Sequence, residues 1–232
     1  LRLDSAQLAL IKAIQETGKP VVVVLMNGRA LCIDWVAQNI PAIVEGWFNG
    51  EKSGLAMADV FLGNVNPGGK LPVTFPRSVG QIPFYYSHKP SSYHRYVDEK
   101  HTPLFPFGQG LSYTTFAYSD LPLPATAIQS TQAFEITLKV TNTEKIAGDE
   151  VVQLDIRDEV ASVTTPVKAL KSFARIALRP GETKTVVFKI NPKEALAVWN
   201  RQMQHVVEPG FFKVMVGSSS EDIRLTGRCE IK

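Results

Sequence analysis

The chain has 232 residues, of which 44% are hydrophobic and 20% are charged, a composition typical of a folded globular chain and not of a disordered one. Its 25 Lys and Arg residues nearly balance 22 Asp and Glu residues, and no basic run occurs, which argues against nucleic acid or an acidic membrane surface as a partner. The longest apolar run, residues 21–26, is too short to span a bilayer, and no signal peptide opens the chain, so we expect no membrane partner.

About the first 65 residues have the pattern of an α/β domain. Apolar periodicity predicts one helix over residues 5–17 and another over residues 53–62. Between them, the uninterrupted β-branched run at 21–26 predicts a strand buried on both faces of a parallel sheet, and residues 42–47 repeat this signal. Two parallel strands do not make a stable domain, so we expect further strands from sequence outside this chain, or a homo-oligomer formed through the exposed half-sheet.

Two segments rich in proline, glycine and aromatic residues follow, NPGGKLPVTFP at 66–76 and LFPFGQGLSYTTF at 104–116. Proline removes backbone donors and glycine admits positive φ, so neither segment is predicted to be a regular helix or a central strand. We predict shaped loops that wrap a domain edge or join two domains. The polar and aromatic stretch at 81–101 is predicted to be an ordered surface loop.

Beyond Phe116 the apolar residues alternate with polar ones, as they do in strands with one buried face. This alternation predicts that Gln153 and Asp155 face solvent. Turn sequences such as Arg179-Pro180-Gly181 separate the runs, and together they predict an antiparallel β-sandwich of the immunoglobulin or fibronectin type III kind. The clearest alternation lies at 134–140, 152–156 and 212–216.

Several runs resemble, in this order, the C-terminal part of glycoside hydrolase family 3, above all its bacterial, periplasmic-type β-glucosidases. They include KPVVVVLMNGRA, AIVEGWFNGEKSGLAMADVFLGNVNPGGKLPVTFP, PLFPFGQGLSYTTF and RPGETKTVVFKI. The family has a (β/α)8 barrel, a six-stranded α/β sandwich and a fibronectin type III-like domain. The resemblance implies α/β plus all-β architecture: a partial α/β sandwich domain at 1–80, an inter-domain loop region at 81–118 and a fibronectin type III-like domain at 119–232.

The family's chemistry is retaining glycoside hydrolysis, which uses two carboxyl groups about 5 Å apart. The resemblance implies that the nucleophilic aspartate lies in the barrel and that the acid/base glutamate of the bacterial branch precedes Leu1, so both are expected outside this chain. In the plant exoglucanase branch the acid/base is the glutamate of a W-x-x-G-x-E-G motif. Lys52 holds that position here, and its ammonium is poorly matched to protonating a glycosidic oxygen.

Glu51 and Glu45 are the candidate catalytic carboxylates of this chain, and Asp98 and Glu99 complete the pool of acids to search. Glu51 lies next to Lys52, with a solvated carboxylate near a helix N-terminus as its alternative reading. Glu45 follows buried-strand residues and is expected to face a site at the carboxyl end of that strand, where α/β sheets bind ligands, with a pairing to a nearby base as its alternative.

Trp47 is a candidate to stack on a pyranose ring, although it could equally belong to the core. The other candidate substrate-binding residues resemble the family's loop between domains, which approaches the sugar site and looks shorter here. The histidines at 88, 94 and 101 fit no common zinc spacing, so we predict neither a metal site nor a cofactor. The substrate-binding candidates are Trp47, Tyr93, Arg95, Tyr96 and Asp98.

Two functions remain open from the sequence. The first is a β-glucosidase-type hydrolase of terminal β-linked glucose, acting on a β-glucoside or cello-oligosaccharide, either completed by residues outside this chain or using the carboxylates named above. The alternative is a non-catalytic carbohydrate-contacting or structural module derived from such an enzyme. The resemblance implies a periplasmic or extracellular location.

Overall fold

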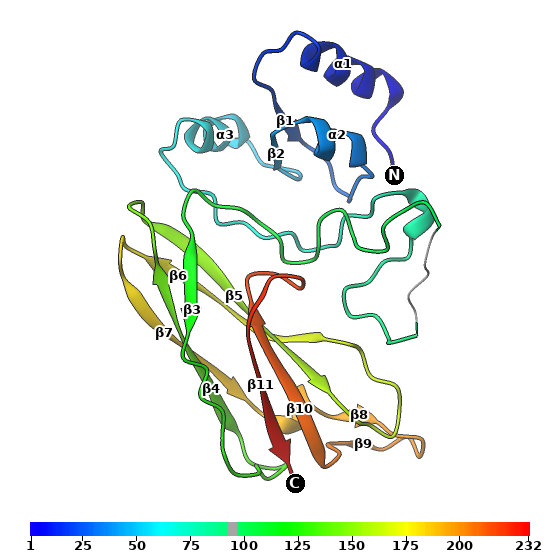
Figure 1. The fold of residues 1–232 in the computed structure, drawn as a ribbon, viewed down its shortest axis with the longest axis vertical. Helices are drawn as coiled ribbons and strands as arrows, with labels where there is room; N and C mark the ends of the chain where they lie inside the picture. The colour runs from blue at the N-terminus through cyan, green and yellow to red at the C-terminus, as the bar shows by residue number, and fades with distance from the viewer. Residues whose placement is uncertain (92–96) are drawn as a thin grey trace. The chain divides into compact units, whose positions relative to one another are not determined.

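The computed structural model describes residues 1–91 and 97–232, and these form two compact units (Figure 1). The first unit comprises the described residues of Leu1–Val65, Val73–Phe84 and His94–Pro106, and the second those of Asn66–Pro72, Tyr85–Tyr93 and Phe107–Lys232. The chain therefore alternates between the units, whereas the sequence suggested three consecutive ranges. None of the helices in the described residues combines the length and the apolar character needed to cross a membrane.

The first unit is built on a parallel pair of strands, as predicted. Its helix α1 begins where the Asp4 carboxylate accepts a hydrogen bond of 2.9 Å from the amide of Ala6, and the chain leaves the helix through Gly18 at φ 69°. The elements are α1 (Ser5–Gln15), β1 (Val22–Leu25), α2 (Asp34–Asn39), β2 (Ala42–Glu45), α3 (Ser53–Phe61) and the 3-10 helix η1 (Val79–Gln81).

Strand β1 is buried on one face only, so the prediction of burial on both faces is wrong for this chain. Val23 and Leu25 are 8% and 5% exposed and pack in the core of the unit, whereas Val22 and Val24 are 50% and 37% exposed. The β-branched run is typical of a strand with both faces covered. In the described residues, however, β2 is the only partner strand of β1. A groove of about 960 Å³ runs between β1 and α1 on the exposed side.

The second unit is the predicted β-sandwich. A three-stranded sheet in the order β3-β4-β7 and a four-stranded sheet in the order β11-β10-β5-β6 enclose one apolar core (Figure 1). A short helix and a hairpin precede β10. The elements are β3 (Phe116–Ser119), β4 (Phe134–Asn142), β5 (Gly148–Asp158), β6 (Ala169–Leu178), β7 (Thr183–Ile190), α4 (Pro192–Ala195), β8 (Val198–Trp199), β9 (His205–Val206), β10 (Gly210–Gly217) and β11 (Ile223–Ile231).

Strand β5 departs from simple alternation, because Gln153 and Asp155 are 4% and 1% exposed. Both were expected to face solvent. The side-chain amide of Gln153 instead donates hydrogen bonds through Nε2 to the carbonyl oxygens of Gly108 at 3.2 Å and Ser218 at 2.6 Å. The loop that carries Gly108 therefore covers a polar face of the sheet that the strand pattern alone predicts to be wet.

Residues 66–72 and 107–116 of the two Pro/Gly segments lie against each other in the second unit as the predicted shaped loops. The amide of Leu71 donates to the carbonyl of Gln109, and the amide of Gly108 donates to the carbonyl of Leu71, both at 2.8 Å. Their backbones approach so closely that a Cβ at Gly110 would lie 2.0 Å from the carbonyl oxygen of Gly69. Only a residue without a side chain fits there.

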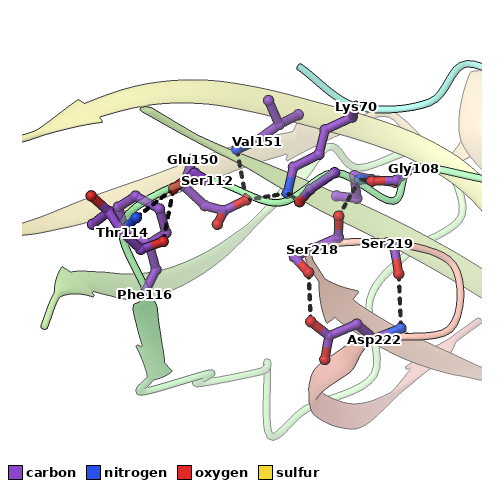
Figure 2. A network of polar contacts seen from close by, with 12 residues as sticks. Lys70, Gly108, Ser112, Thr114, Phe116, Glu150, Val151, Ser218, Ser219 and Asp222 are labelled. Carbon is purple, nitrogen blue, oxygen red and sulfur yellow. Dashed lines mark hydrogen bonds and ion pairs between the residues drawn. The ribbon is translucent and has the colours of Figure 1, made fainter. Parts of the chain in front are cut away.

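A buried ion pair fixes this loop pair to β5. The ammonium of Lys70 lies 3.1 Å from Glu150 Oε1, with side chains only 14% and 7% exposed, and it also donates to the carbonyl of Gly110 at 3.1 Å (Figure 2). Glu150 Oε1 accepts a further bond of 2.9 Å from the amide of Val151. Each charge is thus paired and hydrogen-bonded, as burial requires.

Replacing Gly110 by alanine is expected to destabilise the second unit by about 1–3 kcal/mol, because the methyl group forces the two loop backbones apart. Gly69→Ala is the matched control, since a Cβ at Gly69 meets nothing within 4 Å. Urea unfolding of both variants measures the difference. Equal stability of the two variants would contradict the close approach.

Burial raises the pKa of Asp155 to about 6, with Lys168 and Lys171 opposing that shift. The pKa of Asp155 in the folded chain lies above its ordinary value of 3.8. The contribution of Asp155 to the free energy of unfolding is therefore fully present below about pH 4 and is lost as the pH rises through 6. A rise of about two units corresponds to roughly 3 kcal/mol. Asp155→Asn is expected to remove this decline in urea titrations between pH 4 and pH 7. Asp120→Asn, at an exposed site, is the control, and an unchanged slope in Asp155→Asn would refute the assignment.

Candidate functional site

The candidate site lies at the carboxyl ends of β1 and β2. The strands pair in register, with Leu25 opposite Glu45, so the loops that follow them emerge side by side. The amide of Gly46 donates to the carbonyl of Leu25 at 2.8 Å and extends the pairing by one step. Polar and aromatic side chains of both loops meet beyond that point.

Glu45 joins the two loops. Its Oε1 accepts a hydrogen bond of 3.0 Å from the amide of Trp47, and its Oε2 accepts one of 3.4 Å from the side chain of Asn27. Partial burial raises the pKa of the Glu45 carboxyl, although both hydrogen bonds favour the charged form. The carboxyl group thus clamps the loop after β2 to the loop after β1.

Asn27 is a site residue that the sequence analysis missed, because it lies just beyond the strand predicted at 21–26 and was given no role. Parallel pairing supplies a signal that could have found it. Polar residues that end or follow two adjacent parallel strands meet at one edge of the sheet, as Asn27 and Glu45 do.

Trp47 has a backbone φ of 54°, a left-handed conformation that is unusual for a bulky residue. Its indole ring meets the ring of Phe75 edge-on, with the ring centroids 6.0 Å apart. The ring of Phe75 meets that of Phe105 in the same way, with the centroids 6.1 Å apart. Phe75 is 1% exposed, while Trp47 is half-buried. The indole is therefore part of the packing of the first unit and keeps one portion in solvent.

The next residue, Phe48, is 83% exposed, yet its ring lies directly on the loop after β1. A Cβ at Gly28 would be 2.3 Å from its Cε2 atom. A glycine at that position lets the aromatic ring cover the backbone. The result is an apolar rim beside the Glu45 clamp.

The other candidates are placed less specifically. Glu51 and Lys52 are exposed on the turn before α3, and no side chain caps that helix. Asp98 is exposed, and Glu99 accepts a hydrogen bond of 2.7 Å from Ser78 Oγ. Tyr93, Arg95 and Tyr96 lie outside the described residues. Within residues 1–91 and 97–232, no group of three or more His, Cys, Asp or Glu side chains could hold a metal ion.

Two family profiles match the chain. Residues 1–113 match the Glycosyl hydrolase family 3 C-terminal domain, and residues 150–220 match the Fibronectin type III-like domain. The first range contains the candidate site, and the second lies in the β-sandwich.

Similar proteins include a β-xylosidase of Formosa agariphila, 50% identical over 95% of this chain, and a periplasmic β-glucosidase of Salmonella typhimurium, 48% identical over 97% of it. A β-glucosidase of Listeria innocua in complex with glucose is similar in structure, with a TM-score of 0.93 and 38% identity over 99% of this chain. The chain spans 31% of each of the two sequence relatives and 33% of the Listeria chain, about a third of their length.

The family profiles, these relatives and the fold agree over nearly the whole chain. The chain therefore belongs to glycoside hydrolase family 3 and carries that family's C-terminal domain followed by its fibronectin type III-like domain.

Proposed function

We propose that this chain is the C-terminal part of a β-glucosidase that hydrolyses terminal β-D-glucosyl residues from β-glucosides or cello-oligosaccharides. Its role there is to form a wall of the sugar site, while the nucleophile and the acid/base come from residues outside this chain. The observation that carries the proposal is the similarity, over 99% of the chain, to a β-glucosidase in complex with glucose.

The environment of the candidate carboxylates supports this division of labour. Retaining hydrolysis needs two carboxyl groups held about 5 Å apart, one of them free to attack the sugar. Glu45 is already engaged by Asn27 and by the backbone of Trp47, while Glu51 is exposed on a turn. We infer that Glu45 is a positioning residue that sets the loop bearing Trp47 and Phe48, and that Trp47 offers its exposed portion to the sugar.

One observation favours a second candidate function, in which this chain supplies the proton donor itself. Burial raises the pKa of Glu45, and a carboxyl group with a raised pKa is suited to protonate a leaving glycosidic oxygen. The two candidates differ in what removal of this carboxyl group does to the rate and to the pH profile.

We also propose a cellular location, an association surface and a competing substrate class for this enzyme. The Salmonella typhimurium relative is described as periplasmic, which supports a periplasmic location for this protein. The exposed face of β1, with Val22 and Val24, continues at the exposed Met26 just after the strand. This apolar surface supports association with another part of the protein or with a second copy. The β-xylosidase among the relatives makes β-xylosides the competing substrate class.

A chimera tests the proposed role directly. We expect this chain, substituted for the corresponding third of the Salmonella typhimurium periplasmic β-glucosidase, to support release of p-nitrophenol from its β-glucoside in preference to its β-xyloside. The chain alone is expected to release none, because its proposed role includes no catalytic pair. Turnover by the chain alone that is lost in Glu51→Gln or Glu45→Gln would overturn the proposal.

Glu45→Gln in the same chimera separates the two candidates. A positioning role predicts a kcat reduced by less than about tenfold with an unchanged pH profile, whereas a proton donor predicts a loss of about 10²–10⁴-fold and of the basic limb. Glu16→Gln, at an exposed position after α1, is the matched control. A loss of the larger size in Glu45→Gln alone would assign the proton donor to Glu45.

A further inference from the structure

The hairpin formed by β8 and β9 presents a tryptophan to solvent. Trp199 is 61% exposed and is paired in register with His205 across the hairpin. Figure 1 shows the hairpin at β8 and β9. The imidazole ring lies 5.0 Å from the indole ring with a tilt of 35°. The histidine therefore supports the indole from one side and leaves much of the ring surface open.

The turn between the two strands is rigidly built. The backbone amide of Asn200 donates to the carbonyl of Gln204, and the amide of Met203 donates to the carbonyl of Asn200, both at 3.0 Å. The Asn200 side chain accepts from the amides of Gln202 and Gln204 at 3.0 and 2.9 Å, and donates to Gln204 Oε1 at 3.1 Å. Met203 completes the turn at φ 59°.

The base of the hairpin is anchored in the sandwich. Leu196, which precedes β8, is 5% exposed and belongs to the apolar core, and Val207, which follows β9, packs against that core. A ligand that binds the tip meets a preorganised surface, so little conformational entropy is lost on binding.

We propose that this hairpin is a non-catalytic binding site for a β-linked glucan, with Trp199 as the stacking platform. β-Linked glucose has equatorial ring substituents, so each face of its ring is a flat array of C–H groups that matches an exposed indole. Contact between a large aromatic side chain and water is unfavourable, so the free energy falls when an apolar face of a ligand covers the ring.

The polar surroundings favour a neutral sugar over a charged ligand. Residues 198–207 contain no Asp or Glu and a single charged side chain, that of Arg201. Exposed amide and imidazole groups flank the platform, and these donate to and accept from hydroxyl groups. They belong to Gln202, Gln204 and His205.

The proposal rests on the hairpin alone and holds whether or not the chain takes part in hydrolysis. Native gel electrophoresis of this chain through soluble β-1,4- or β-1,3-glucan is expected to show retardation relative to a gel without polysaccharide. Trp199→Ala is expected to raise the Kd about tenfold or more, and Trp199→Phe to raise it less. Phe173→Ala, which removes another aromatic ring that is 66% exposed, is the matched control and is expected to bind as the wild type does.

Three results would overturn the site. They are no retardation of the wild-type chain by either glucan, equal retardation of the wild type and Trp199→Ala, or a change of oligomeric state in Trp199→Ala without any glucan binding. The last outcome would make the hairpin a contact between protein chains. Circular dichroism of each variant confirms that the comparison is between folded proteins.

Discussion

The close approach of the two Pro/Gly segments, fastened to β5 by the ion pair of Lys70 with Glu150, is the constraint on which the second unit depends. The segments are distant in sequence, yet their backbones touch at Gly69 and Gly110 and exchange hydrogen bonds at Leu71. Apart from Phe116, which begins β3, and an isolated bridge between Phe75 and Phe105, the segments have no regular secondary structure. Backbone hydrogen bonds, the buried ion pair and the absence of side chains at the glycines therefore hold them together. Residues 66–72 and 107–116 are thereby part of the β-sandwich unit, while residues 73–76 and 104–106 belong to the first unit.

At the carboxyl ends of β1 and β2, a single carboxyl group joins two loops. Glu45 ties the loop after β2 to Asn27 and holds Trp47 in a left-handed backbone conformation beside Phe75. An edge of a parallel sheet with a fixed aromatic residue suits a family that handles sugars. In the proposed function this edge shapes the site, and the chemistry lies with carboxyl groups elsewhere.

Much of the fold could be predicted from the sequence because the signals are local. The alternation at 134–140 and the β-branched run at 21–26 predicted strands that the structure contains. The predictions of burial were wrong for Gln153, Asp155, Val22 and Val24, and all four errors have one cause. Whether a strand face is wet depends on what covers it, and the covering segment at Gly108 is 45 residues from Gln153 in the chain. Asn27 was missed for a related reason, since its partner Glu45 is 18 residues away and only parallel pairing brings them together.

A double-mutant cycle on Lys70 and Glu150 tests the central claim most directly. Lys70→Met and Glu150→Gln each leave the partner charge buried, so each single variant is expected to lose about 3–5 kcal/mol of unfolding free energy in urea. The double variant should lose clearly less than the sum, with a coupling of about 2 kcal/mol or more between the two sites. Additive losses, with a coupling near zero, would contradict the account, because the ion pair would then not hold the loops to the sandwich.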